Sequence, residues 1–235
     1  MNRQIPSRRS RVGIIDLNSG NLLSIKTAIE KAGCEWQVVQ QPRPELLTAV
    51  DVLVMPGQGR FAFVMNQIDQ LGWREFLLEW CRNGKRLVGI CVGMQVLFEG
   101  SDEDPEAAGL GLFTGRCQKL PHPKTPMVGW AQLSSLSQCM LAVGSQSESE
   151  QDANQTKPSS EAGFLASPKR REARFNVYAY FVNSFAIYEN PFCTAKVNYG
   201  HEFCAAVQRG NLYGFQFHPE KSGRFGQELI QYVCQ

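Results

Sequence analysis

The sequence predicts an α/β protein built on an open, mostly parallel sheet with flanking helices and added antiparallel strands. Up to residue 100, short apolar runs typical of buried strands alternate with segments whose apolar residues recur at helical spacing. Strands that alternate with helices in this way form parallel β-α-β units. From residue 177 onward, short strands follow one another across turn residues instead, which is typical of antiparallel pairs. A length of 235 residues can accommodate one large domain of this kind.

The first half of the chain contains four predicted strands with their covering helices. Residues 1–11 precede them as a basic leader that we expect to be frayed, and an address signal is the alternative. The strands are predicted at 12–16, 36–39, 52–55 and around 87–90. Helices are predicted at 21–32, 46–50, 63–68 and 73–82, and another through residues 94–98. Gly33 stands where the first helix needs a C-terminal cap.

The second half is less regular. Residues 101–108 are expected to form an acidic loop, and 109–120 a weak strand or hairpin. The stretch 134–174 is a polar insertion rich in Ser, Gln, Glu and Lys, most of which we expect to lack fixed structure. Strands are predicted at 177–182, 195–199, 204–208 and 212–217, with a closing helix at 225–233. The middle two strands should pair through Gly200 and His201. Residues 12–235 are thus predicted to form a single domain that carries the insertion.

Composition argues against several classes of function. Hydrophobic residues at 43% and charged residues at 20% are typical of a globular protein. A formal net charge of +2 gives no indication of a nucleic-acid or membrane partner. No apolar run approaches the roughly 20 residues of a transmembrane helix. The eight cysteines show no CxxC pair, no metal-like His spacing and no secretory signal ahead of them, so we expect a cytoplasmic protein without a metal.

Cys91 lies at the turn between the fourth strand and the following helix. Gly89 and Gly93 flank it at two residues on either side and allow the backbone to bend sharply without a Cβ clash. The side chain then projects from the turn as in a nucleophile elbow. The N-terminus of the helix faces the sulfur, and its free amides favour the thiolate over the thiol. The alternative is a buried structural cysteine at a glycine-rich turn.

Two further motifs are predicted at the same sheet edge, where open α/β sheets place their sites. The third strand ends in Pro56-Gly57-Gln58-Gly59, which can present bare backbone amides, although a simple tight turn is the alternative. The last strand ends in His218-Pro219-Glu220. Residues two apart in an extended segment point to the same side, so His218 and Glu220 can be hydrogen-bond neighbours. This geometry suits an imidazole base that a carboxylate orients toward Cys91.

These motifs carry a resemblance to a known family. GICVGMQ at 89–95 and GFQFHPEKSG at 214–223 together resemble the paired signature of class I glutamine amidotransferases. More specifically, the chain looks like the glutaminase subunits of imidazole glycerol phosphate synthase. The stretches that carry this resemblance are VGIIDLNSGNLLSIKTAIEKAG, PGQG, Met94-Gln95, Gly129-Trp130 and NYGHEFCAAVQRGNLYGFQFHPEKSG. Relatives that serve anthranilate, GMP or carbamoyl phosphate synthesis usually carry His in place of Met94. The resemblance covers residues 12–233 except the insertion and implies the flavodoxin-like fold of the class.

The resemblance also implies site residues and a reaction, hydrolysis of glutamine to glutamate and ammonia without a cofactor. Cys91 would attack the glutamine amide, while His218, oriented by Glu220, would protonate the departing ammonia and then activate water. The oxyanion hole would use backbone amides of Val92 and of the loop residues Gly57, Gln58 and Gly59. Further residues implied in glutamine binding are Gln95, Glu99, Asn183 and Ser184.

A partner is implied as well. In the family the glutaminase docks as a heterodimer on a cyclase subunit of (β/α)8-barrel fold, and ammonia passes through the barrel to form imidazole glycerol phosphate in histidine biosynthesis. The family usually reads close to PHMGWN and FVHSY where this chain has PMVGWA at 126–131 and FVNSF at 181–185, and the polar insertion is a third departure. A paralogue that feeds ammonia to a different synthase is therefore an alternative. A catalytically silent partner-binding subunit is the third hypothesis.

Overall fold

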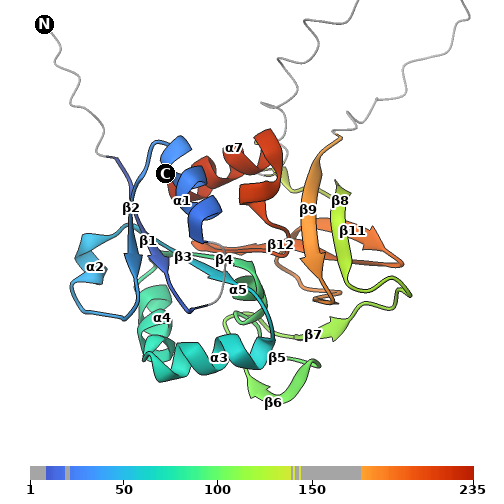
Figure 1. The fold of residues 1–235 in the computed structure, drawn as a ribbon, viewed down its shortest axis with the longest axis horizontal. Helices are drawn as coiled ribbons and strands as arrows, with labels where there is room; N and C mark the ends of the chain where they lie inside the picture. Colours follow the sequence, from blue (N-terminus) through green and yellow to red (C-terminus); the bar gives the residue numbers. More distant parts are fainter. Residues whose placement is uncertain (1–8, 19–21, 139, 141–142, 144–175) are drawn as a thin grey trace, which may run out of the picture.

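The computed structural model describes residues 9–18, 22–138, 140, 143 and 176–235. These residues form two sheets, and helices cover both faces of one half of the larger one (Figure 1). The larger sheet has the strand order β2-β1-β3-β4-β13-β12-β11-β8-β9, and the smaller has the order β10-β7-β5-β6. The predicted α/β class with a mixed sheet is therefore confirmed.

One half of the larger sheet is parallel. Its strands are β1 (Arg11–Ile15), β2 (Glu35–Val39), β3 (Val52–Gly57), β4 (Arg86–Cys91) and β13 (Leu212–Phe215). Every residue of β3 is buried, because helices cover both faces of a parallel sheet. The four strands predicted up to residue 100 are confirmed, with β3 reaching two residues further than expected. As a result, β3, β4 and β13 end side by side at one edge.

The other half is antiparallel. Its strands are β12 (His201–Arg209), β11 (Cys193–Tyr199), β8 (Met127–Ser134) and β9 (Tyr178–Asn183). The predicted pairing through Gly200 and His201 is confirmed as the β11–β12 hairpin. The smaller sheet consists of β5 (Gly100–Ser101), β6 (Asp104–Ala108), β7 (Arg116–Lys119) and β10 (Phe185–Ala186).

The helices lie in two layers. α1 (Leu22–Lys31) packs with α7 (Gly223–Cys234) on one side of the sheet, and α3 (Phe61–Gln70) packs with α4 (Trp73–Arg82) on the other (Figure 1). The short α2 (Leu46–Ala49) precedes β3. In α4, Trp73, Leu77 and Trp80 recur at helical spacing and are fully buried, which anchors this layer. Gly33 has the positive φ of 76° expected for the cap after α1.

The predicted extent of the helix through residues 94–98 is wrong. α5 (Val92–Gln95) has a single turn, since the N–H groups of Leu97 and Phe98 donate three residues back instead of four. The chain tightens there because Phe98 turns into the core, where it is fully buried and stacks on Phe113. Residues beyond Gln95 therefore do not continue the helical face of α5.

The acidic loop predicted at 101–108 is also wrong, because these residues contain the β5–β6 hairpin. The Glu103 and Asp104 carboxylates each accept a 3.0 Å hydrogen bond, from the N–H groups of Phe61 and Ala62 respectively. These amides belong to the first turn of α3, where helix N–H groups lack partners within the helix and negative charge is favoured. The acidic run thus caps a helix. The strand or hairpin predicted at 109–120 is found only as β7.

Residues 1–8 of the leader and 144–175 of the insertion lie outside the described residues, so the expectations for both stay predictions. Arg11, assigned to the leader, begins β1, and its N–H donates to Asp51 Oδ2 at 2.9 Å. Met140 and Val143, within the predicted insertion, are buried. In the part of the chain that the structure describes, the helices are too short or too polar to cross a bilayer.

The close contact of α5 with β3 predicts a severe effect of Gly93→Ala. A Cβ atom at this position would collide with the backbone carbonyl of Met55, which cannot move without displacing β3. We expect urea denaturation to show a loss of about 4 kcal/mol in the free energy of unfolding. The control is Gly13→Ala, whose Cβ would be too close only to the end of the Leu53 side chain, and this substitution should cost about 1 kcal/mol. Equal losses in the two variants would contradict this account of the packing.

Candidate active site

Cys91 is the last residue of β4 and adopts φ 56° and ψ −115°, a conformation that residues other than glycine rarely occupy. Such strain is typical of a nucleophile elbow. Gly89 and Gly93 permit it, since a Cβ atom on Gly89 would collide with the backbone of Gly93. The Cys91 side chain is 4% exposed, and its Sγ donates to the carbonyl of Val182 at 3.7 Å. The elbow predicted at Cys91 is therefore present.

His218 follows β13, the parallel neighbour of β4, so the two strand ends bring it beside Cys91. Its Nδ1 lies 2.8 Å from Glu220 Oε1, and both side chains are almost fully buried. The predicted pairing is confirmed, but the predicted reason is wrong. Pro219–Lys221 forms the 3₁₀ turn η2, so Glu220 reaches His218 across a tight turn and not along an extended strand.

The backbone of His218 is fixed from two elements. Its N–H donates to the carbonyl of Tyr180 in β9 at 2.9 Å. Its carbonyl accepts a 2.7 Å hydrogen bond from Ser222 Oγ. These contacts, together with Glu220, hold the imidazole in one orientation.

Opposing effects act on the pKa of His218. Burial disfavours the charged imidazole and lowers the pKa, but hydrogen bonds and charge interactions with Cys91 and Glu220 outweigh burial and raise the pKa to about 9. At neutral pH His218 therefore carries a proton that it can donate on the side facing Cys91. A protonated imidazole next to a nucleophile suits general acid catalysis.

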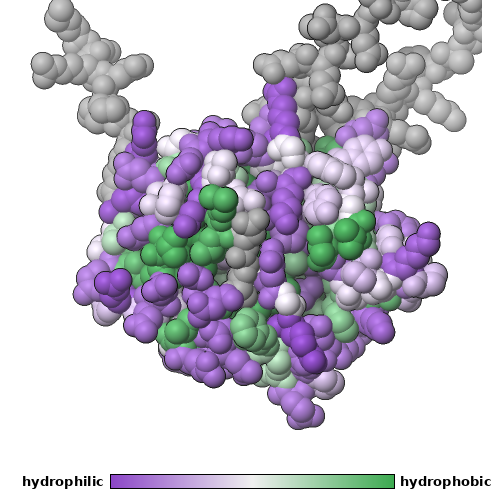
Figure 2. Space-filling view, in the orientation of Figure 1, coloured by the Kyte–Doolittle hydropathy of each residue, from purple (hydrophilic) through white to green (hydrophobic). Residues whose placement is uncertain are grey.

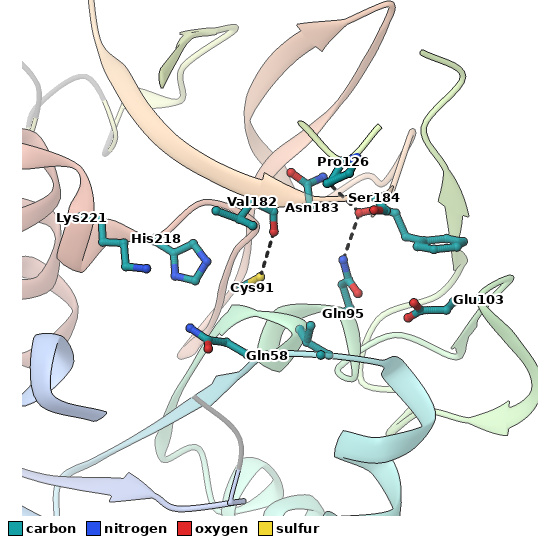
Figure 3. Close-up of a pocket in the computed structure, with 13 residues that line it drawn as sticks. Gln58, Cys91, Gln95, Glu103, Pro126, Val182, Asn183, Ser184, His218 and Lys221 are labelled. Atoms are coloured by element: carbon teal, nitrogen blue, oxygen red, sulfur yellow. Dashed lines mark hydrogen bonds between the residues drawn. The ribbon is translucent and has the colours of Figure 1, made fainter. Parts of the chain in front are cut away.

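Cys91 and His218 face a cavity of about 450 Å³. Figure 3 shows the sulfur between His218 and Gln95, with Gln58 on one side and Val182 and Asn183 on the other. The lining residues that sequence analysis assigned to the site are Gln58, Gly59, Cys91, Val92, Gln95, Asn183, Ser184 and His218. The further lining residues are Glu103, Pro126, Val182, Phe185 and Lys221.

Two predicted residues lie behind this wall. Gly57 is buried in β3, directly beside Cys91 in the strand register, and a Cβ atom there would meet the backbone N of Gly93 at 2.6 Å. Glu220 lies on the far side of His218 from the cavity, as its contact with Nδ1 requires. Both therefore shape the site without lining it.

The expected role of Glu99 in glutamine binding does not agree with the structure. Glu99 is exposed, does not line the cavity, and its Oε2 accepts a 2.8 Å hydrogen bond from Gly115 N–H. The expectation assumed one more helical turn beyond Gln95. Since α5 ends at Gln95, residue 99 points elsewhere.

The Phe185 carbonyl sets the direction of two amide side chains in the wall. It accepts hydrogen bonds from Gln95 Nε2 at 3.0 Å and from Asn183 Nδ2 at 3.1 Å. Because a carbonyl only accepts, the amide oxygens must point away from it. Asn183 is 6% exposed, and its Oδ1 has no hydrogen-bond partner among the described residues. An unpaired buried acceptor costs about 1–3 kcal/mol, so it indicates a ligand that donates.

Sequence analysis missed three polar residues around Cys91. Glu103 and Lys221 line the cavity, and the buried Gln216 places its Nε2 4.0 Å from Cys91 Sγ. Gln216 and Lys221 lie within the GFQFHPEKSG motif, so proximity to His218 in sequence was an available signal. For Glu103 the sequence offered no signal beyond the acidic run, because it is the packing of the β5–β6 hairpin that brings this residue to the cavity.

Removing the charge of Glu220 is expected to lower the pKa of His218. Glu220→Gln keeps the size of the side chain but takes a stabilising partner from the imidazolium. NMR titration of the imidazole signals should give a midpoint at about 9 for His218 in the unmodified chain and about one unit lower in the variant. The chain has three histidines, so the other two serve as internal references. The exposed Glu106→Gln is the control, and equal shifts in both variants would refute the pairing.

Comparison with known proteins agrees with this geometry. The family model for glutamine amidotransferase class-I matches residues 13–233. Imidazole glycerol phosphate synthase subunit HisH of Desulfitobacterium hafniense is 35% identical over 223 residues, 94% of this chain and 92% of the relative. The HisH subunit of Methanothermobacter thermautotrophicus is 36% identical over 222 residues, 94% and 96% of the two chains.

Solved structures support the fold. A glutamine amidotransferase crystal structure superposes with a TM-score of 0.65 at 16% identity, covering 95% of this chain and 98% of the other. The PurLQS structure from Thermotoga maritima gives a TM-score of 0.60 at 15% identity, covering 96% and 98%. With the family model spanning the parallel sheet, the elbow and the His-Pro-Glu turn, this chain belongs to the class I glutamine amidotransferases.

Proposed function

We propose that this chain is the glutaminase subunit of an imidazole glycerol phosphate synthase. It releases ammonia from glutamine and delivers it to a cyclase subunit of (β/α)8-barrel fold for histidine biosynthesis. The observation that carries the proposal is the placement of Cys91 and His218 at one wall of a cavity of about 450 Å³, with Glu220 paired to His218 behind that wall. The identity of 35–36% to HisH subunits over nearly the whole chain supports the pathway.

Glutamine binding is proposed to use the acceptors on the wall opposite His218. Gln95 and Asn183 both turn their amide nitrogens to the Phe185 carbonyl, which leaves their oxygens to accept from the α-ammonium group of the substrate. Glu103 adds a carboxylate to the same cavity. An ammonium group donates three hydrogen bonds and accepts none, so it matches this set of acceptors. The side-chain amide of the substrate then extends toward Cys91.

In the first half-reaction, the Cys91 thiolate forms a C–S bond with the amide carbon of glutamine. The amide oxygen becomes an oxyanion, which takes hydrogen bonds from the Val92 N–H and from an N–H of the loop Gly57–Gly59. His218 gives its proton to the amide nitrogen, the C–N bond breaks, and ammonia leaves a γ-glutamyl thioester on Cys91. The raised pKa of His218 keeps the imidazole protonated until the C–N bond breaks and the nitrogen takes up the proton.

In the second half-reaction, neutral His218 takes a proton from water, whose oxygen attacks the thioester carbon. The C–S bond breaks, glutamate leaves, and the Cys91 thiolate and the imidazolium are restored. Glu220 holds Nδ1 throughout, so the nitrogen facing Cys91 both gives and takes the proton.

The outward face of β8 and β9 is the proposed docking surface for the cyclase. Val128 pairs with Val182 across the two strands, and both are exposed together with Trp130 and Tyr178. In Figure 2, green and pale side chains gather over these strands. Contiguous exposed apolar surface of this kind marks interaction sites. Since β9 also places Asn183 in the cavity, a partner on this face contacts a strand that forms part of the wall of the site.

Docking next to the site suits the chemistry of ammonia, because ammonia that is protonated in water is no longer a nucleophile. A partner that covers the exit can receive ammonia before that happens. We further propose a cytoplasmic location. The described cysteines are free thiols, which agrees with a reducing compartment.

Cys91→Ala is expected to abolish synthesis of imidazole glycerol phosphate from glutamine, by roughly 10⁴-fold, while synthesis from added ammonia continues. The variant removes the nucleophile, but the cyclase still receives ammonia from solution. Product formation by the reconstituted pair with each nitrogen source measures both activities. Cys81→Ala, in α4, is the matched control and should retain both.

Glutamine-dependent synthesis that survives in Cys91→Ala would overturn the mechanism. If a glutamine analogue labels Cys91 but no histidine-pathway cyclase activates the chain, the partner is a different synthase.

Trp130→Glu is expected to weaken binding to the cyclase about 30-fold or more, because a central aromatic side chain often dominates the affinity of an interface. Titration calorimetry of the two subunits measures the change. Phe63→Glu, an exposed aromatic position on α3, is the control and should leave the affinity unchanged. Unchanged affinity in Trp130→Glu would place the interface elsewhere.

A further inference from the structure

Gln216 is a fully buried polar side chain next to the nucleophile. It lies between the end of β13 and His218, is 0% exposed, and its backbone N–H donates to the Ala205 carbonyl at 2.9 Å. Its side-chain amide lies between Gln95, whose Nε2 donates to Gln216 Oε1 at 3.0 Å, and Cys91, whose Sγ lies 4.0 Å from Gln216 Nε2. Burying an amide next to a reactive sulfur is costly unless both ends are paired.

A chain of hydrogen bonds fixes which end of this amide faces the sulfur. The Phe185 carbonyl accepts from Gln95 Nε2, and the second N–H of the same nitrogen goes to Gln216 Oε1. With its oxygen committed to Gln95, Gln216 can turn only its N–H₂ group toward Cys91. A backbone carbonyl thus determines that a donor and not an acceptor meets the sulfur.

The two forms of Cys91 use different partners. The thiol donates to the Val182 carbonyl at 3.7 Å. The thiolate has no proton to donate and needs donors, which the structure supplies from Gln216 Nε2 and from His218. Hydrogen bonds to a charged group are stronger than those to a neutral one, so the Gln216 contact favours the thiolate.

The same chain segment delivers both donors. Gln216 and His218 both lie within three residues of the end of β13, in a bent segment that turns both side chains to the sulfur of Cys91. Phe217 between them faces the core, where its ring packs against Phe181 and Phe225. Gln216 therefore cannot shift relative to His218 without disturbing that packing.

We propose that Gln216 is a positioning residue that links glutamine binding to activation of the nucleophile. It orients Gln95 toward the substrate and donates a hydrogen bond to the Cys91 thiolate. This role deepens the proposed glutaminase function and rests on it for the part that concerns glutamine.

The first test needs no glutamine. Alkylation of Cys91 by iodoacetamide is followed by peptide mass spectrometry across pH, in the purified chain and in Gln216→Leu and Gln216→Glu. The other ionisable groups around the sulfur are His218 with Glu220 behind it, Lys221 beside His218, and Glu103 across the cavity (Figure 3). All of them are retained in the variants. We expect the midpoint of the pH profile to rise by about 0.5–1 unit in Gln216→Leu. In Gln216→Glu it should rise further, because a carboxylate repels the thiolate.

The second test uses the complex with the cyclase. Loss of the Gln216 contact to Gln95 is expected to raise KM for glutamine about three- to tenfold and to lower kcat as well. Gln70→Leu, exposed at the end of α3, is the matched control and should change neither the pH profile nor KM.

The outcomes separate the two proposals. An unshifted alkylation midpoint in a folded Gln216 variant would overturn the positioning role, because a merely structural glutamine would change the melting temperature alone. If Gln216→Leu does not fold, Gln216→Glu, whose side chain has the same size as the native one, provides the test of the positioning role. A shifted midpoint in a chain that never hydrolyses glutamine would uphold the contact to Cys91 and refute the glutaminase proposal instead.

Discussion

The packing of α5 against β3 and β4 is the constraint on which the rest of the site depends. Gly57, Gly89 and Gly93 let three backbone segments approach more closely than any side chain would permit. That approach forces Cys91 into its strained turn, since the chain must leave β4 and enter a helix within one residue. A less compact turn would leave the sulfur in the core or lead it away from the sheet edge.

The parallel pairing of β4 with β13 then completes the catalytic group. Phe215 lies opposite Ile90, so the residues that follow each strand emerge together. The segment after β13 supplies Gln216 and His218 to the sulfur, and the η2 turn returns Glu220 to the far nitrogen of the imidazole. Short segments after β4 and β13 are enough to bring these side chains together, because neighbouring parallel strands end at the same edge of the sheet.

β9 joins catalysis to the proposed partner. Along this strand, side chains alternate between the two faces of the sheet. Asn183 faces the cavity, and its buried oxygen has no hydrogen-bond partner in the described part of the chain, whereas the side chains of Val182 and Tyr178 are exposed on the apolar surface. A protein that docks on one face can therefore bias the position of the groups on the other. The departure from FVHSY at residues 181–185 falls in this strand, so any change that it brings affects both faces at once.

The sequence by itself determined the parallel strands, the turn at Cys91 and the pairing of His218 with Glu220, because apolar periodicity and glycine spacing act over short stretches of chain. It misplaced Glu99 and gave no signal for Glu103. Those positions depend on where α5 stops and where the β5–β6 hairpin packs. Only the tertiary structure decided which amide atoms face Cys91 and the cavity, since the carbonyl that orients Gln95 belongs to Phe185, 90 residues away. Hydrogen-bond direction is a property of the assembled wall, and no local pattern encodes it.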